Sequence, residues 1–325
     1  MSITVYDQQR SLTAIRRDDD RFRNGHLKRQ RGPLFRVDRA FKAFFRRVKA
    51  GEKPGYPRFK SRDRWNSVEI AEQYTVKDGR FHSKDFNGIK IHLHRPLPEG
   101  AKHCGATLIR DHKGWLVNLK LEIGEPPEAG PVKSMMGLDV GLNAFVATSD
   151  GEFVSAPRNY RKAEKELRRR QRALSRCKRG SNRRKKVKHR VIALHARVAN
   201  TRKDFAHKLA RDFARSTDLI AVEDLNIRGM VKNKHLSKSI SDAGWGDFLS
   251  KLAYKAEEAG RHFVKVNPRN TSQHCSGCGV TVKKSLAVRT HECAECGLVL
   301  DRDVNAARNI LARATVGKHG AGGEC

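Results

Sequence analysis

The chain has 325 residues, which is long enough for two or three domains with a sizeable core. Its 68 Lys and Arg residues outnumber its 35 Asp and Glu residues, so the formal net charge is +33 and the pI is near 10.4. Positive charges of this number repel one another and destabilise the compact state unless a polyanion is bound, which favours nucleic acid over a membrane surface as the partner. No run of about 18 apolar residues and no basic-then-apolar leader are present, so we expect a cytoplasmic protein without a spanning helix.

The N-terminal region predicts basic helices followed by a mixed loop. Residues 1–50 have helical spacing, and the basic residues between the apolar positions are left to face a partner. Residues 51–62 break the helix and mix aromatic with cationic side chains. That mixture suits phosphate contacts and base stacking, although an ordinary basic loop fits the composition equally well. The apolar positions at helical spacing are Val37, Phe41, Phe44, Phe45 and Val48, and we expect the phenylalanines to face a core.

Short alternating strands follow between residues 68 and 123, and they predict a small β domain. His92 and His94 share one face of an expected strand, but no further ligands stand at metal spacing, so we interpret them as a surface pair. The Pro- and Gly-rich residues 124–131 form a linker, and a new domain is expected to begin near Val132.

Residues 136–151 predict a buried strand, a glycine bend, a second strand and an Asp-Gly turn. Asp139 lies inside the first apolar run, where a carboxylate is costly unless something binds it. Two interpretations stay open for this stretch alone. Asp139 either caps the bend at Gly141 or binds a metal ion.

A dense basic segment predicts a helical hairpin over residues 158–215, broken at 178–182. Between residues 158 and 190, 17 Lys or Arg residues stand against two Glu residues, a local excess of about +15. A charge run is usually only a solvated face. The density of this one favours a cradle for a polyanion.

The next elements predict an α/β domain. Residues 218–225 form a buried strand that ends in Glu223 and Asp224, and such a strand is typically parallel with its C-terminal end at the functional edge. A helix over residues 245–260 and a short strand over 263–266 follow.

Four of the seven cysteines form two Cys-x-x-Cys-Gly knuckles, separated by 14 residues. Four thiolates at this spacing can close a structural, tetrahedral zinc site, and the paired knuckles favour zinc over an iron–sulfur cluster or disulfides. The other three cysteines are scattered thiols. His274 and His291 adjoin the knuckles, and we do not assign them as ligands. The predicted zinc ligands are Cys275, Cys278, Cys293 and Cys296.

Three acidic residues then form a possible catalytic set: Asp139, Glu223 and Asp303. Asp303 stands where an N-cap would, before a helix expected to begin near Val304, and capping does not exclude metal binding. Carboxylates on neighbouring strands and one helix can hold two Mg²⁺ ions about 3.5–4 Å apart, as in two-metal nucleases. The order of these residues suits an RNase H-like α/β domain.

Several segments together resemble TnpB, the transposon-encoded, RNA-guided DNA nuclease family considered ancestral to type V CRISPR effectors. The resemblance rests on residues 137–141, 221–227 and 301–310 with the preceding knuckles, and on residues 38–42 and 54–60 upstream. Members of this family usually begin some tens of residues earlier, so we expect a wedge region that is short at its N-terminus. A shorter wedge region would affect recognition of the adjacent motif and binding of the guide RNA.

The resemblance implies a RuvC-like nuclease domain of the RNase H-like fold, with an inserted zinc ribbon and an N-terminal helical and β recognition and wedge region. We expect the recognition and wedge region over residues 1–130, the first part of the nuclease domain over 131–270, the ribbon over 271–297, and the last part with the C-terminal tail over 298–325. The basic helices 158–215 belong to the first nuclease part.

The resemblance also implies an insertion-sequence-encoded, Mg²⁺-dependent DNA endonuclease. Its partners would be a guide RNA from the transposon end and a target double-stranded DNA, cut at one site next to a short adjacent motif. The family's acidic triad falls on Asp139, Glu223 and Asp303, and Asp301 is a second candidate for the third position. A nuclease-silent, RNA-guided repressor-like protein and a guide-free transposase accessory protein are the alternatives. Loss of the triad would mark the former, and this sequence keeps it.

Two groups of residues are candidates for nucleic-acid contacts, because the protein must bind the charged phosphate backbone of a guide–target heteroduplex. Tyr56, Arg58 and Lys60 are candidates near the adjacent motif. The candidates for the heteroduplex grip are Arg168, Arg169, Arg172, Arg176, Arg183 and Arg184.

Overall fold

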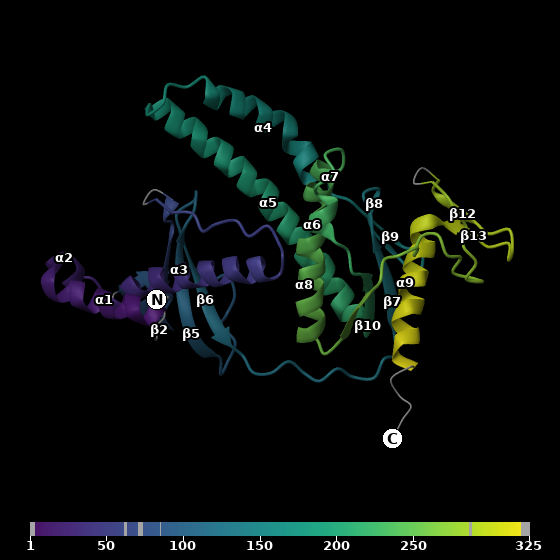
Figure 1. Cartoon of the computed structure of the whole chain (residues 1–325), viewed down its shortest axis with the longest axis horizontal. Helices are drawn as coiled ribbons and strands as arrows, with labels where there is room; N and C mark the ends of the chain where they lie inside the picture. The colour runs from purple at the N-terminus through teal and green to yellow at the C-terminus, as the bar shows by residue number, and fades with distance from the viewer. Residues whose placement is uncertain (1–3, 62–63, 71–73, 85, 286–287, 320–325) are drawn as a thin grey trace. The chain divides into compact units, whose positions relative to one another are not determined.

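The computed structural model describes most of the chain, namely residues 4–61, 64–70, 74–84, 86–285 and 288–319. The chain divides into two compact units, Met1–Glu125 and Pro126–Cys325 (Figure 1). Among the helices in the described ranges, none carries an apolar stretch long enough to cross a bilayer.

The first unit begins with three helices, and the expected helical character of this region is confirmed. They are α1 (Val5–Asp18), α2 (Asp20–Arg23) and α3 (Leu27–Lys49). A capping box formed by Thr4 and Asp7 starts α1, because each side chain satisfies the backbone N–H of the other residue. Arg16 then bridges the ends of α1, α2 and α3 by donating to the carbonyl oxygens of Phe22 and Gly25 and to the side chain of Gln30.

The prediction that α3 packs its apolar face on a core is wrong. No residue of α3 is buried, and Phe45 keeps 61% of its surface exposed. The rings of Phe41 and Phe44 instead meet Tyr56 of the following loop edge-on, with centroids 5.6 and 5.5 Å apart. Helical periodicity identifies residues that share a face, but it does not say whether another element covers that face. Val37 and Val48 are exposed as well.

The strands expected after residue 68 are present in the rest of the first unit. Ile70, Tyr74, Phe81 and Ala106 form its core. His92 and His94 lie beyond the end of the last strand of the second sheet, so their placement in a strand is wrong, whereas both are exposed as expected of a surface pair. One antiparallel sheet has the order β1-β5-β6 and the other β2-β3-β4. The strands are β1 (Ser67–Ile70), β2 (Tyr74–Lys77), β3 (Arg80–Ser83), β4 (Phe86–Lys90), β5 (Lys102–Arg110) and β6 (Trp115–Glu122).

A five-stranded mixed sheet organises the second unit, in the order β11-β10-β7-β8-β9. β8 runs antiparallel to both β7 and β9, whereas β10 is parallel to both β7 and β11. The expected strand, bend and strand around Asp139 are β7 and β8, and the predicted parallel strand is β10. The five strands are β7 (Met135–Val140), β8 (Ala144–Thr148), β9 (Phe153–Ser155), β10 (Leu219–Glu223) and β11 (His262–Val266).

Helices cover both faces of this sheet, as side-chain alternation along β10 requires. Ile220 and Val222 pack with α5 (Asn182–Ser216) and α8 (Trp245–Glu258) on one face. Leu219 and Ala221 pack on the other face with α9 (Arg302–His319), which lies along β7 in Figure 1.

The predicted helical hairpin consists of α4 (Asn159–Ser175) and α5, with its break at residues 176–181. The buried Asp242 of α7 (Ser237–Ala243) anchors this hairpin, because its carboxylate accepts hydrogen bonds from the backbone N–H groups of Tyr160, at 2.8 Å, and Arg161, at 3.3 Å. Ahead of α7 stands the short α6 (Ile227–Met230), and the cysteine-rich segment contains β12 (Thr290–Glu292) and β13 (Val299–Asp301).

Candidate active site and zinc centre

Three acidic side chains converge at one edge of the sheet, on the face that α9 covers. Along β10, Glu223 continues the alternation of Leu219 and Ala221 toward α9. Val222 is paired with Leu138 in the parallel register, so Glu223 and Asp139 each follow that pair by one residue. Asp303 belongs to the first turn of α9. The alternation of two parallel strands and the start of one helix therefore bring these carboxylates together.

Asp139 is half-buried, and the pKa of its carboxyl group is the most strongly shifted of the three. Burial raises its pKa well above the usual range, and the negative charges of Glu223 and Asp303 raise it further. Arg302 and Arg289 oppose this effect without cancelling it. A buried carboxyl group surrounded by like charges is stable as an anion only when a cation joins it. Carboxylate oxygens are the ligands that Mg²⁺ prefers, so the residue types suit a divalent ion, whereas among the described residues the four cysteines alone form a close metal-binding group.

Glu223 receives a hydrogen bond from a residue that sequence reasoning missed. The hydroxyl group of the buried Thr271 donates to Oε1 of Glu223. Burial raises the pKa of Glu223, and the Thr271 hydrogen bond and the charge of Arg313 lower it in part. Thr271 lies 48 residues from Glu223 in the sequence, and no motif marks it as a partner.

Asp303 does not cap α9, so that expectation is wrong. The carboxylate of Asp301 accepts a hydrogen bond from the backbone N–H of Asp303 at 2.7 Å, which makes Asp301 the capping residue. Arg289, from the loop between the two knuckles, forms an ion pair with Oδ2 of Asp303. Arg302 lies 3.5 Å from Oδ1 of the same carboxylate. Arg289 is a second partner of the carboxylates that no sequence motif marks.

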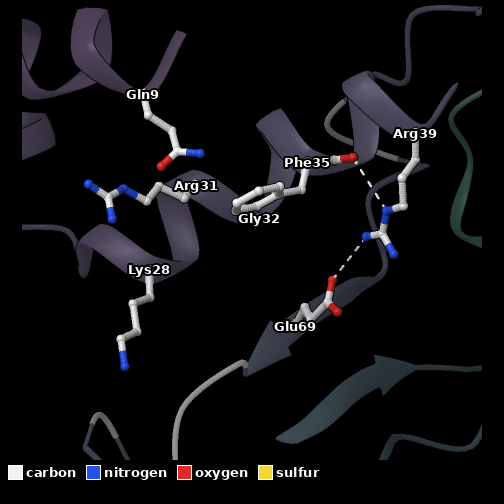
Figure 2. A pocket seen from close by; sticks show the side chains of 7 residues that line it. All are labelled: Gln9, Lys28, Arg31, Gly32, Phe35, Arg39 and Glu69. Carbon is white, nitrogen blue, oxygen red and sulfur yellow. Dashed lines mark hydrogen bonds and ion pairs between the residues drawn. The ribbon is translucent and has the colours of Figure 1, made fainter. Parts of the chain in front are cut away.

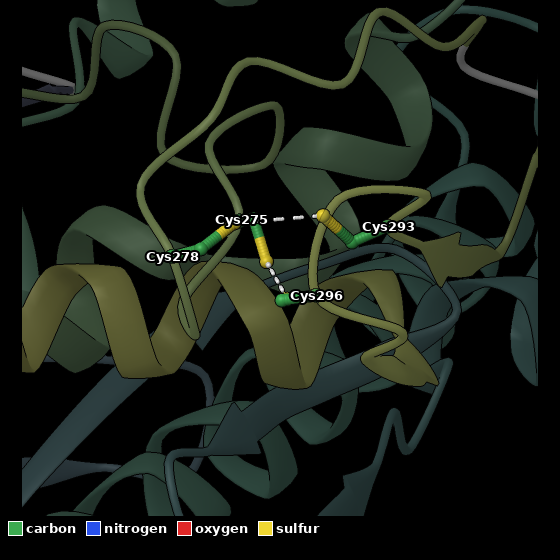
Figure 3. Close-up of side chains that lie close together, drawn as sticks. All are labelled: Cys275, Cys278, Cys293 and Cys296. Atoms are coloured by element: carbon green, nitrogen blue, oxygen red, sulfur yellow. Dashed lines mark hydrogen bonds between the residues drawn. The ribbon is translucent and has the colours of Figure 1, made fainter.

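The four predicted zinc ligands lie together, with all their sulfur atoms within 4.8 Å of one another (Figure 3). The Sγ atoms of Cys275 and Cys296, and those of Cys278 and Cys293, are each 3.6 Å apart. A tetrahedral zinc ion with Zn–S bonds of about 2.3 Å would hold sulfur atoms roughly 3.8 Å apart. The arrangement fits a closed structural site. His274 and His291 are not among these clustered ligands.

The thiols of this cluster do not ionise equally. Burial opposes ionisation of Cys275, but backbone N–H groups of Cys278 and Gly277 and the His291 side chain stabilise its thiolate and lower its pKa to about 5. At Cys296 a backbone hydrogen bond from Leu298 favours the thiolate, yet burial and the neighbouring thiols raise the pKa to about 12. Four thiolates side by side therefore need a bound cation.

The predicted arginines of α4 lie along one groove. Its volume is about 1050 Å³, and seven cationic side chains line it against one carboxylate, that of Glu164. Glu164 forms an ion pair with Lys238 of α7 and another with Arg168, at 3.1 Å. The predicted residues that line the groove are Arg168, Arg169, Arg172 and Arg176.

The two predicted arginines of α5 differ in their surroundings. Arg183 is exposed near the start of the helix. Arg184 donates from Nη1 to the carbonyl oxygens of Leu174, at 2.7 Å, and Cys177, at 3.2 Å. Arg184 thus stabilises the turn of the hairpin, a role that its place in a basic run does not reveal.

The three candidates in the loop of the first unit are exposed. Tyr56 contacts the aromatic side chains of α3 edge-on but keeps 69% of its surface exposed. Arg58 is exposed, and the ammonium group of Lys60 lies 5.2 Å from the centre of the Trp65 ring. The loop therefore presents both aromatic and cationic groups.

A pocket of about 450 Å³ lies within the first unit, between α1, α3 and β1 (Figure 2). The Phe35 ring, 43% exposed, lies between the Gln9 side chain and Arg39 in this view. Arg39 is 3.6 Å from Glu69, the one carboxylate in the lining. The Gln9 Nε2 atom is buried and has no hydrogen-bond partner. Lys28 and Arg31 complete the cationic part of the lining.

Comparison with known proteins identifies relatives along most of the chain. The OrfB_IS605 family model, described as "Probable transposase", matches residues 118–234, and the "Cas12f1-like, TNB domain" model matches residues 245–310. Among solved structures, the "Cryo-EM structure of CRISPR-Cas12f Ternary Complex" aligns with a TM-score of 0.45 and 16% identity over 88% of this chain and 69% of that one.

Two curated relatives match over most of both chains. The "Putative RNA-guided DNA endonuclease" of Streptomyces pristinaespiralis is 38% identical over 285 residues, which cover 86% of this chain and 69% of the relative. The "Putative RNA-guided DNA endonuclease InsQ" of Escherichia coli K12 is 30% identical over 294 residues, which cover 85% of this chain and 71% of the relative. With these identities over more than two thirds of each relative, the chain belongs to the TnpB family.

Proposed function

We propose that this chain is an insertion-sequence-encoded, RNA-guided, Mg²⁺-dependent DNA endonuclease. It uses a guide RNA from the transposon end and cuts double-stranded target DNA beside a short adjacent motif, with a single RuvC-type active site. The observation that carries the proposal is the meeting of Asp139, Glu223 and Asp303 on the α9 face of the sheet, in a chain that belongs to this family.

Each region of the chain has its own part in this activity. Residues 131–270 and 298–325 form the nuclease domain in two pieces, and residues 271–297 form the zinc ribbon. Residues 1–130 form the recognition and wedge region. The division of the structure into units near residue 125 supports an independent recognition region.

Asp139, Glu223 and Asp303 are the residues that would hold the divalent ions. Two bound Mg²⁺ ions would supply an activated water molecule and stabilise the leaving oxygen of the cleaved phosphodiester. The protein's contribution is to hold three carboxylates in a partly buried site, where burial and mutual repulsion favour a bound cation. The Thr271 hydroxyl fixes Glu223, whereas Arg289 and Arg302 pair with Asp303 and would compete with a bound ion for its carboxylate.

The α4 groove is the surface that would grip the nucleic-acid backbone. Lys and Arg side chains that repeat along one helix face meet successive phosphates, and their contribution falls as salt rises. Replacing Arg172, which lines the groove, with Gln should lower the slope of log K against log salt by about one. An unchanged slope would remove Arg172 from the interface.

The pocket of the first unit carries chemistry of the same kind. Lys28, Arg31 and Arg39 supply positive charge around the exposed ring of Phe35. An unstacked base can lie on such a ring while its phosphates meet the cations. The unpartnered amide of Gln9 would then serve as a donor to the base edge. We include this pocket in the RNA-binding surface.

The test compares cleavage by two variants that lose one carboxylate each. The protein is expressed with its flanking transposon RNA, the RNA that co-purifies is sequenced, and a plasmid carrying a randomised adjacent motif serves as substrate. The Asp139→Asn variant should bind the same RNA and cut nothing. The matched control is Asp224→Asn, which removes an exposed carboxylate beside Glu223 that pairs with Lys265 at 3.3 Å and should leave cutting intact.

Three outcomes would refute the proposal. Undiminished cutting by Asp139→Asn would remove the carboxylates from the chemistry. Defined transposon-end RNA with no cutting by the unmodified protein would favour a repressor-like role. Random co-purified RNA would favour a guide-free transposase accessory protein. Metal analysis is expected to find one zinc ion per chain, bound by the clustered cysteines.

A further inference from the structure

The segment that leads into the first knuckle touches the candidate active site through Thr271. Its side chain is 4% exposed, and its Oγ1 lies near two acceptors, Oε1 of Glu223 and the carbonyl oxygen of Pro268. A hydroxyl group has a single hydrogen to donate, and an anionic carboxylate is the stronger acceptor. The shorter contact is the one to Glu223, whereas the Pro268 contact measures 3.2 Å. Thr271 therefore restricts the rotation of Glu223.

Two buried asparagines of α9 hold this segment in place. The Nδ2 atom of Asn309 donates to the carbonyl oxygens of Thr271, at 2.8 Å, and His274, at 2.7 Å. Asn305 donates to the same His274 carbonyl at 2.7 Å and accepts the backbone N–H of Ser276 at 2.9 Å. Asn305 is fully buried, and 9% of Asn309 is exposed.

These contacts connect the ribbon with the acidic residues in a continuous path. His274 and Ser276 flank the zinc ligand Cys275, and Asn305 and Asn309 follow Asp303 on α9. Thr271 completes the path to Glu223 on β10. A shift of the first knuckle relative to α9 would move the hydroxyl group that orients Glu223.

We propose that Thr271 is a positioning residue for Glu223, and that the zinc ribbon, held to α9 by Asn305 and Asn309, sets the affinity of the carboxylate site for divalent cations through it. The inference rests on the proposed function in taking Glu223 as a metal ligand. Partners that orient a metal ligand typically change metal affinity by 10- to 100-fold when they are lost. This predicts a coupling between a structural zinc site and a catalytic magnesium site.

The test measures Mn²⁺ binding to the full zinc-loaded chain without nucleic acid, by electron paramagnetic resonance of the free ion. Thr271→Val removes the hydroxyl group at nearly constant volume and should weaken Mn²⁺ binding about tenfold. Thr271→Ser keeps the hydroxyl group and should restore binding to within about threefold of the unmodified chain. Thr281→Val makes the same change at an exposed position of the ribbon and should leave Mn²⁺ affinity unchanged.

A double-mutant cycle tests the path through α9. Asn309→Ala should also weaken Mn²⁺ binding, and adding Thr271→Val to it should cost much less than the sum of the two single effects, because both act through one segment. Additive effects would overturn the path. Equal Mn²⁺ affinity of Thr271→Val and Thr271→Ser would overturn the positioning role.

The outcomes separate this inference from the proposed function. Guided cleavage with unchanged Mn²⁺ affinity in Thr271→Val would refute the inference and leave the nuclease assignment standing. An unmodified chain that binds no Mn²⁺ would refute both. Zinc content and the thermal midpoint are measured for every variant, so that a folding defect is not mistaken for a loss of metal affinity.

Discussion

Gly137 on β7 allows α9 to approach the sheet closely enough to bring Asp303 near Asp139. A Cβ atom added at Gly137 would lie 2.0 Å from the carbonyl oxygen of Ala307 and 3.0 Å from Cβ of Leu311. Real Cβ atoms do not approach such atoms closer than 3.0 Å, so α9 would have to retreat by roughly 1 Å. The obstacle is backbone in a buried helix, and it cannot rotate away.

We therefore expect Gly137→Ala to destabilise the second unit by about 3 kcal/mol, at the upper end of the usual cost of overpacking. For a unit of this size, that loss lowers the thermal midpoint by roughly 6–12 °C. The retreat also moves Asp303 away from Asp139, so Mg²⁺ should bind more weakly. Calorimetry measures the first effect, and Mn²⁺ titration of the folded variant measures the second.

Gly246 of α8 provides the matched control. A Cβ atom there would meet only Cδ1 of Ile227, at an ordinary contact distance of 3.7 Å, so Gly246→Ala should be neutral or stabilise by about 0.5 kcal/mol. If Gly137→Ala has the thermal midpoint and Mn²⁺ affinity of the unmodified protein, the close approach of α9 to β7 does not hold the site together, and our account of its geometry is wrong.

Three further substitutions test separate parts of the site. Asp139→Asn should stabilise the metal-free, zinc-loaded protein against urea at pH 8 and have little effect at pH 4. Folding raises the pKa of the Asp139 carboxyl group, so the free energy of unfolding falls as pH rises through that pKa and stays lower above it. Equal effects at both pH values would contradict this. Arg289→Gln removes a cation that pairs with Asp303 and should tighten Mn²⁺ binding about fivefold, or about 1 kcal/mol, in a titration without nucleic acid. Weaker binding would make Arg289 a support of the metal site instead of a competitor. Phe35→Ala should weaken guide-RNA binding about tenfold in a filter assay through lost stacking, whereas Phe45→Ala, on an exposed ring of the same helix outside the pocket, should not; equal losses would exclude the pocket.

Much of the second unit could be predicted from local patterns. The run around Asp139 and the one ending at Glu223 have the composition of buried strands, and a parallel strand places its functional groups at its C-terminal end. The cysteine spacing predicts the sulfur cluster because each knuckle is a local turn. Such features depend on a few neighbouring residues, and the sequence displays them directly.

Other features depend on long-range packing and gave no such signal. The apolar face of α3 is regular, but whether an element covers it depends on the rest of the first unit, and Phe45 is exposed. The choice between Asp301 and Asp303 as the cap depends on where β13 ends, which its pairing with β12 determines. Thr271 and Arg289 reach their carboxylates only after the ribbon has folded onto α9.

Reprogramming the guide tests the central claim most directly. The variable segment of the co-purified RNA is replaced with a new sequence, and cleavage of a plasmid carrying the new target is followed in Mg²⁺. The account predicts that the cut moves with the guide and disappears when Glu223 is replaced with Gln. A cut that ignores the guide, or one that persists in the Glu223→Gln variant, would contradict the account.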